Sequence, residues 1–195
     1  MFNARRSLVL LTAVGSLGTI VHAQTQAKDR YRDGVSLALS YDTLGGSITT
    51  RNTFGTQGGA AEVNFSFFHG LGATASVLGL HADSVGSGVP VNLMIVTFGP
   101  SYTYTCSRHG ARPVSLFAHG LVGEVDGFHG LYPQAGTASS SADSLAVQAG
   151  GGVDIGLTRL LAVRLVQADY VRTQLPNSLT NVQNSVRLGV GIVLR

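Results

Sequence analysis

Residues 184–195 alternate between apolar side chains and polar or very small ones. Because successive side chains of a β-strand point to opposite faces, this pattern predicts one strand with an apolar face and a polar or small-residue face. A strand in this position predicts a sheet that its last strand completes, as happens in a barrel. The apolar face consists of Val186, Leu188, Val190, Ile192 and Leu194.

Seven earlier segments are also strand-like, so the sequence predicts eight strands of roughly ten residues each, the length of a transmembrane β-strand. In the seventh strand the apolar residues move from odd-numbered positions to even-numbered ones near Val166, which predicts a β-bulge there. In the fifth strand the apolar residues fall at both odd and even positions, so the sequence does not show which face is apolar. The seven segments are Val35–Asp42, Ala61–Phe67, Leu71–Ala82, Val91–Cys106, Val114–Val125, Ser144–Thr158 and Leu161–Leu175.

The predicted connections alternate in length. Tight turns at His69-Gly70 and Thr158–Leu160 are interleaved with longer or more polar connections, and Ser107–Pro113 departs from this rhythm. Long loops at one end and short turns at the other are typical of an up-and-down transmembrane barrel. The longer connections are Thr43–Gly58, Asp83–Pro90, Gly127–Asp143 and Pro176–Gln183.

Alternation alone leaves open which face meets solvent. A soluble exported barrel or sandwich that binds an apolar ligand has the same pattern, but its apolar face points inward. Lys28 is the single lysine and charged residues make up 12% of the chain, whereas a soluble surface carries about 25 to 35%. The polar face is rich in Ser, Thr, Asn, Gln, Ala and Gly, which suits a narrow, crowded interior. We therefore expect the apolar face to meet lipid.

The first residues predict export. Arg5 and Arg6 precede an apolar stretch, and Val21-His22-Ala23 has the small-x-small pattern of a cleavage site. We therefore expect a cleavable signal peptide at 1–23, a periplasmic leader at 24–33 and a barrel domain at 34–195. Removing the signal lowers the formal charge from +3 to about +1, and no basic run predicts nucleic-acid binding. Cys106 is the single cysteine, so no internal disulfide is expected.

Taken together, these strands resemble the small outer-membrane β-barrel family, the OmpA-like and OmpX-like eight-stranded barrels. The most specific motif is Arg187-x-Gly189-x-x-Ile192-x-Leu194, which is similar to the signal by which such barrels are recognised for insertion. Here Leu194 stands where the family usually has an aromatic residue, and Arg195 follows it. The resemblance implies an all-β, antiparallel, transmembrane barrel in the bacterial outer membrane, with outer-membrane lipid and the barrel assembly machinery as partners.

With the apolar face outside, several charged side chains point into the lumen. Asp154 and Arg164 flank a tight turn at equal distances, which predicts a cross-strand ion pair near the periplasmic end. Asp42, Glu62 and Arg187 lie on the first, second and last strands, so barrel closure predicts a second luminal cluster near the loop end. These charges fill and balance a polar interior, or alternatively form a gate or plug.

Catalytic and cofactor motifs are missing from the sequence. The histidines have no metal-ligand spacing, although His119 and His129 lie close in sequence to Ser115, Glu124 and Asp126. The sequence thus predicts no cofactor or metal and a non-enzymatic envelope protein with a structural or surface-interaction role, its loops available to an extracellular partner. A soluble apolar-ligand binder and an outer-membrane lipid-modifying enzyme are the alternatives.

Overall fold

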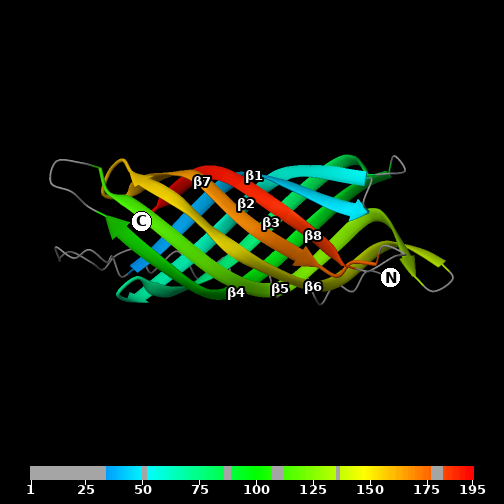
Figure 1. Cartoon of the computed structure of the whole chain (residues 1–195), viewed down its shortest axis with the longest axis horizontal. Coiled ribbons are helices and arrows are strands. Elements are labelled where there is room, and N and C mark those ends of the chain that lie inside the picture. The colour runs from blue at the N-terminus through cyan, green and yellow to red at the C-terminus, as the bar shows by residue number, and fades with distance from the viewer. Residues whose placement is uncertain (1–33, 50–51, 86–88, 107–111, 135–136, 177–181) are drawn as a thin grey trace, which may run out of the picture.

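The computed structural model describes residues 34–49, 52–85, 89–106, 112–134, 137–176 and 182–195. The expected signal peptide at 1–23 and leader at 24–33 lie outside these residues. Eight strands follow one another and pair antiparallel in a closed barrel (Figure 1). They are β1 (Gly34–Thr49), β2 (Asn52–Phe68), β3 (Leu71–Val85), β4 (Val89–Cys106), β5 (Val114–Gln134), β6 (Thr137–Gly156), β7 (Leu161–Thr173) and β8 (Gln183–Leu194).

The last strand closes the barrel, as its alternation predicts. β8 pairs with β7 on one side and with β1 on the other, in a register that runs from Leu37 opposite Leu194 to Ser47 opposite Asn184. Closure leaves no open sheet edge along the barrel wall. The predicted fold, an eight-stranded antiparallel up-and-down barrel, is confirmed.

The two ends of the barrel differ in their connections. The turn end carries the turn at His69-Gly70, where both residues have positive φ, and the tight connection at 157–160; the loop end lies opposite. The expected loops Thr43–Gly58 and Gly127–Asp143 are wrong, because β1–β2 and β5–β6 continue through them as paired strands. Residues 43–58 and 137–143 are mainly Gly, Ser, Thr and Ala, so these segments lack the apolar alternation that marks a strand in sequence.

The β5–β6 hairpin projects beyond the barrel wall. Pairing of β4 with β5 ends at Asn92 opposite Phe128, and pairing of β6 with β7 ends at Ala146 opposite Thr173. The two hairpin strands nevertheless stay paired with each other as far as Gln134 and Thr137. Figure 1 shows this hairpin reaching past the other strands at the loop end.

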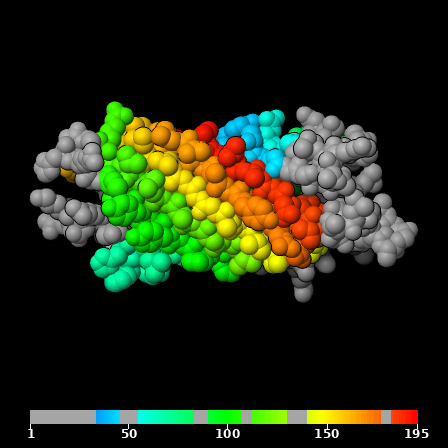
Figure 2. All heavy atoms as spheres, viewed as in Figure 1, coloured from blue at the N-terminus to red at the C-terminus, as the bar shows by residue number. Residues whose placement is uncertain are grey.

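The outer wall of the barrel is apolar. Phe98 is 67% exposed, and the alternating residues of β8 from Val186 to Leu194 are all exposed. Toward the loop end, the outward positions become polar or charged, as at Thr43, Gln57 and Arg172. Figure 2 shows the strands of this wall as oblique bands packed side by side. The exposed aromatic residues include Tyr41, Phe65, Phe67, Phe98, Tyr102, Tyr104 and Tyr170.

The lumen has two halves of different polarity. Charged and polar side chains dominate the half toward the turn end, which ends in a small apolar cluster of Ala38, Ala162 and Val193, whereas the half toward the loop end holds a larger apolar cluster. The polar interior that the sequence predicts is therefore only partly present in the loop half, where Thr56, Gln183 and Ser185 are buried beside the apolar cluster. The larger cluster packs Leu44, Ala60, Leu78, Leu80, Leu93, Ile95, Val125, Ala142, Ala146, Val171 and Leu175.

The bulge predicted in the seventh strand is confirmed. In β7 the register shifts between Arg164 and Gln167 against β8, and Leu165 and Val166 both face outward. This extra outward residue lets Arg164 and Gln167 both point into the lumen. In the described part of the chain, no helix has the length and hydrophobicity needed to cross a membrane.

Candidate functional site

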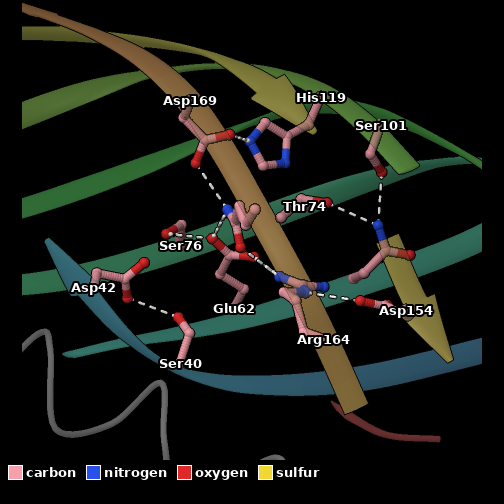
Figure 3. A network of polar contacts seen from close by, with 12 residues as sticks. Ser40, Asp42, Glu62, Thr74, Ser76, Ser101, His119, Asp154, Arg164 and Asp169 are labelled. Atoms are coloured by element: carbon pink, nitrogen blue, oxygen red, sulfur yellow. Dashed lines mark hydrogen bonds and ion pairs between the residues drawn. The ribbon is translucent and has the colours of Figure 1, made fainter. Parts of the chain in front are cut away.

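Arg164 lies at the turn-side edge of a buried charged network in the lumen. Its Nε donates to Asp154 Oδ1 at 3.0 Å, and its Nη1 donates to Glu62 Oε2 at 2.6 Å. Asp154 and Arg164 are direct cross-strand partners on β6 and β7, the two strands joined by the tight turn. The guanidinium also stacks over the Phe117 ring, with Cζ 4.1 Å from the ring centroid. Figure 3 shows Arg164 and Glu62 meeting in the middle of the network.

Arg187, from the last strand, holds the other side of the network. Its Nε donates to Asp42 Oδ1 at 2.7 Å, and its Nη1 lies 3.0 Å from Glu62 Oε1 and 3.3 Å from Asp169 Oδ2. The side chain is fully buried. One arginine on β8 thus binds carboxylates on β1, β2 and β7, the strands around the point of closure. Ser40 completes this group by donating to Asp42 Oδ2 at 2.7 Å.

Asp169 connects the network to the opposite wall. Its Oδ1 lies 3.0 Å from His119 Nε2, and its Oδ2 accepts from Gln148 and Gln167, each at 2.8 Å. Gln167 also donates to Glu62 Oε1 at 2.8 Å. Asp169, His119 and Gln167 were absent from the sequence-predicted clusters. After the bulge at Val166, Ala168 and Tyr170 face outward, and the alternation therefore places Gln167 and Asp169 inside. The sequence thus already indicated that these two side chains point into the lumen.

Luminal glycines make room for these side chains. A Cβ built on Gly189 would collide with Asp42 Oδ1, and one built on Gly150 would collide with Asp169 Oδ1. A Cβ on Gly152 would come within 2.8 Å of the Phe117 ring. Gly150 and Gly152 thus accommodate the Asp169 carboxylate and the Phe117 ring. The packing of the network therefore requires glycine at these positions as well as the charged side chains.

The five sequence-predicted luminal residues meet in one network rather than in two clusters. Glu62 joins the two predicted clusters, because its Oε2 contacts Arg164 and its Oε1 contacts Arg187. Among the described residues, Asp42, Glu62, Asp154 and Asp169 face Arg164 and Arg187, so the buried carboxylates outnumber the buried guanidiniums. Each carboxylate has a cationic or hydrogen-bonding partner, which offsets the cost of burial.

The residues of the terminal motif divide between the two faces of β8. Arg187 and Gly189 face the lumen, whereas Ile192 and Leu194 face outward and are 46% and 44% exposed. Leu194 lies beside Leu37 on β1 and Leu161 on β7, at the turn end of the point of closure.

The histidines that the structure describes assemble no catalytic constellation with the residues named from the sequence. Glu124 and Asp126 lie on the outer face of β5, opposite to the lumen-facing His119. Ser115 shares the inner face with His119, but its hydroxyl contacts Thr105 and Arg195. Within the described ranges, no group of three His, Cys, Asp or Glu is placed to hold a metal ion.

The sequence matches no protein-family model and no curated protein. Among solved structures, Neisserial surface protein A has a TM-score of 0.58 at 14% sequence identity, over 82% of this chain and 96% of that one. The chain has the fold of the small outer-membrane β-barrels. This confirms the resemblance at the level of fold.

Two other solved outer-membrane barrels align over similar lengths. Ail, the attachment invasion locus protein of Yersinia pestis, has a TM-score of 0.47 at 14% identity, over 83% of this chain and 99% of its own. The N-terminal barrel domain of Pseudomonas aeruginosa OprF has a TM-score of 0.41 at 9% identity, over 82% of this chain and 96% of its own.

Proposed function

We propose that this protein is a non-enzymatic outer-membrane β-barrel that anchors the β5–β6 hairpin at the bacterial cell surface, in a structural or surface-interaction role. The observation that carries the proposal is the distribution of polarity across the wall. Apolar side chains such as Phe98 and Val190 are exposed outside, while the ion pairs of Arg164 and Arg187 are buried inside. This arrangement suits a wall surrounded by hydrocarbon, where backbone groups must be satisfied within the barrel.

The side chains packed in the lumen support anchoring over transport. An eight-stranded barrel is just wide enough for side chains to fill. Here the charged network occupies one half, and buried residues such as Leu78, Ile95 and Val125 occupy the other. A closed barrel with these buried contacts is a suitable base for the hairpin that continues beyond Phe128.

Cell fractionation and gel migration test the location. We expect the protein in the outer-membrane fraction, resistant to carbonate extraction, with a band that migrates differently before and after boiling. Recovery in the soluble periplasmic fraction without detergent would contradict the proposal. A protease applied to intact cells should cut within 127–143 and leave the barrel wall intact, which tests whether the hairpin faces outward.

The soluble apolar-ligand binder is the weaker alternative. Its ligand would need an apolar cavity inside, but the apolar side chains of the lumen pack against one another, with Val125 and Ala146 fully buried. A lipid-modifying enzyme would need a nucleophile beside His119, whose Nε2 instead lies 3.0 Å from Asp169 Oδ1. Activity that survives purification and disappears in His119→Gln, with the fold retained, would revive the enzymatic alternative.

For assembly we propose a signal peptide at 1–23, a periplasmic leader at 24–33 and recognition of the terminal motif by the barrel assembly machinery. Ile192 and Leu194 are outward-facing and so accessible on an unclosed β8, whereas Arg187 and Gly189 serve the lumen. We expect Leu194→Ala to slow assembly in cells while refolding into detergent in vitro stays unchanged. Val190→Ala, on the same outward face but outside the motif, is the matched control. Equal effects of the two variants in cells would argue against the motif.

A further inference from the structure

A groove crosses the outer wall near the loop end, over β8, β1, β2 and β3. It has a volume of about 570 Å³ and is lined by Thr43, Gly45, Gly55, Gln57, Val186 and Leu188, among others. Gly45 and Gly55 are direct cross-strand partners, and Val186 lies beside Gly45 on the other side. A Cβ added to either glycine would meet nothing within 4 Å, so the groove exists because these two side chains are absent.

A polar row borders the groove. Thr43 lies between Leu188 and Gln57, and Gln57 lies opposite His81 on β3. Tyr41 donates from Oη to Gln57 Oε1 at 2.8 Å, which fixes the amide and directs its NH₂ group away from Tyr41. His81 Nδ1 is 2.7 Å from Asn92 Oδ1. This border is therefore a set of oriented dipoles, and the described lining holds no Asp, Glu, Lys or Arg.

The groove lies where the apolar wall gives way to polar residues. Leu39, Val190 and Ile192 are exposed on its turn side, whereas Gln57 and His81 lie at its polar border. In a bilayer this is the depth at which acyl chains meet the ester groups of the lipid. The volume falls in the range of about 300–1,000 Å³ that small-molecule sites occupy.

We propose that the Gly45–Gly55 groove binds one membrane lipid, with an acyl chain along Val186 and Leu188 and an ester carbonyl that accepts from the Gln57 NH₂ group, beside Thr43 and His81. The inference rests on the proposed membrane location, which determines that lipid covers this wall. A lipid phosphate would be bound by Arg or Lys. The lining has neither, so it favours the ester region of a lipid. The continuous apolar wall on the turn side gives the chain a surface to follow.

Photolabelling tests the site with the full mature protein in phosphatidylethanolamine and phosphatidylglycerol vesicles. The probe is phosphatidylethanolamine with a diazirine in one acyl chain. We expect labelled peptides to concentrate in 43–57 and 186–188, and Gly55→Leu to reduce that labelling about fivefold by filling the groove. Gly120→Leu is the matched control, because Gly120 is also an exposed strand glycine with nothing within 4 Å of an added Cβ. Even labelling around the barrel, or equal labelling in Gly55→Leu, would overturn the site.

The polar border is tested separately with ester-linked and ether-linked probes. The ether lipid lacks the carbonyl, so the wild type should retain the ester probe about three- to tenfold better, the effect of one hydrogen bond. Thr43→Val with Gln57→Leu should abolish that preference and keep the labelling position. Equal retention of both probes by the wild type would overturn the ester contact. A boiling-dependent gel shift in the same vesicles reports insertion, so a failed site is distinguishable from a failed membrane location.

Discussion

Glu62 is the residue on which the luminal network converges. It receives Arg164 on one oxygen, Arg187 and Gln167 on the other, and Ser76 Oγ lies 3.5 Å from Oε1. Neither arginine can be removed without leaving this buried carboxylate under-compensated. Parity places Glu62 inside, but it cannot tell how far an arginine reaches across a narrow lumen. That is why sequence reasoning finds the five charged residues and separates them into two groups.

We expect Arg187→Ala to lower the free energy of unfolding by about 3–5 kcal/mol, because it leaves Asp42 and Glu62 buried with fewer cationic partners. Urea titration in detergent micelles, followed by the unboiled gel band, measures the change. Arg172→Ala is the control, since Arg172 is exposed on the outer face of the neighbouring strand. A similar loss in both variants would show that the luminal contacts of Arg187 are not the cause.

Gly189 offers a second test at the level of single atoms. Its missing side chain leaves the space that Asp42 Oδ1 occupies. Gly189→Ala should therefore displace that carboxylate from Arg187 and cost about 1–3 kcal/mol, the usual effect of overpacking. Gly120→Ala adds the same methyl group in open space and should leave the urea midpoint close to that of the wild type.

At the scale of the strand, sequence parity finds all eight elements and the bulge but misjudges their length and the loop half of the lumen. In β5, Leu116 and Val122 face outward while Leu121 and Val125 face inward, so both faces are apolar and no alternation survives. The start of β6 lacks it for the opposite reason, because residues 137–142 are small and mostly polar on both faces. Alternation identifies a strand only where its two faces meet different environments.

The bulge in β7 gives a prediction about register. Leu165 and Val166 together stand between Arg164 and Gln167, so deleting Leu165 keeps both side chains in the lumen and leaves their partners in register. We expect this deletion to yield a barrel that still shifts on boiling. Deleting Ala168 instead inverts the parity of Asp169 and the residues after it, and should prevent folding. Loss of the folded band in the Leu165 deletion would show that the bulge itself is required.

For the whole molecule, the filled lumen predicts that the purified protein conducts no large, stable single-channel current. Arg164→Ala should lower stability more than it changes conductance, because the apolar half still blocks the lumen. Planar-bilayer recordings together with urea titration of the same preparation measure both effects. Stable currents from the wild type would contradict the filled-lumen description and favour the gate or plug.

The division of the lumen between apolar and charged halves also sets how such a barrel can acquire a pore. The charged half already holds hydrophilic groups that water could solvate, and its apolar cluster of Ala38, Ala162 and Val193 is small, so the larger apolar barrier to ions lies in the loop half. A few substitutions of Leu78, Leu80 or Leu93 by serine would hydrate that half without touching one ion pair. A few substitutions would therefore convert this closed barrel into one with a narrow channel, and all of them would change uncharged residues.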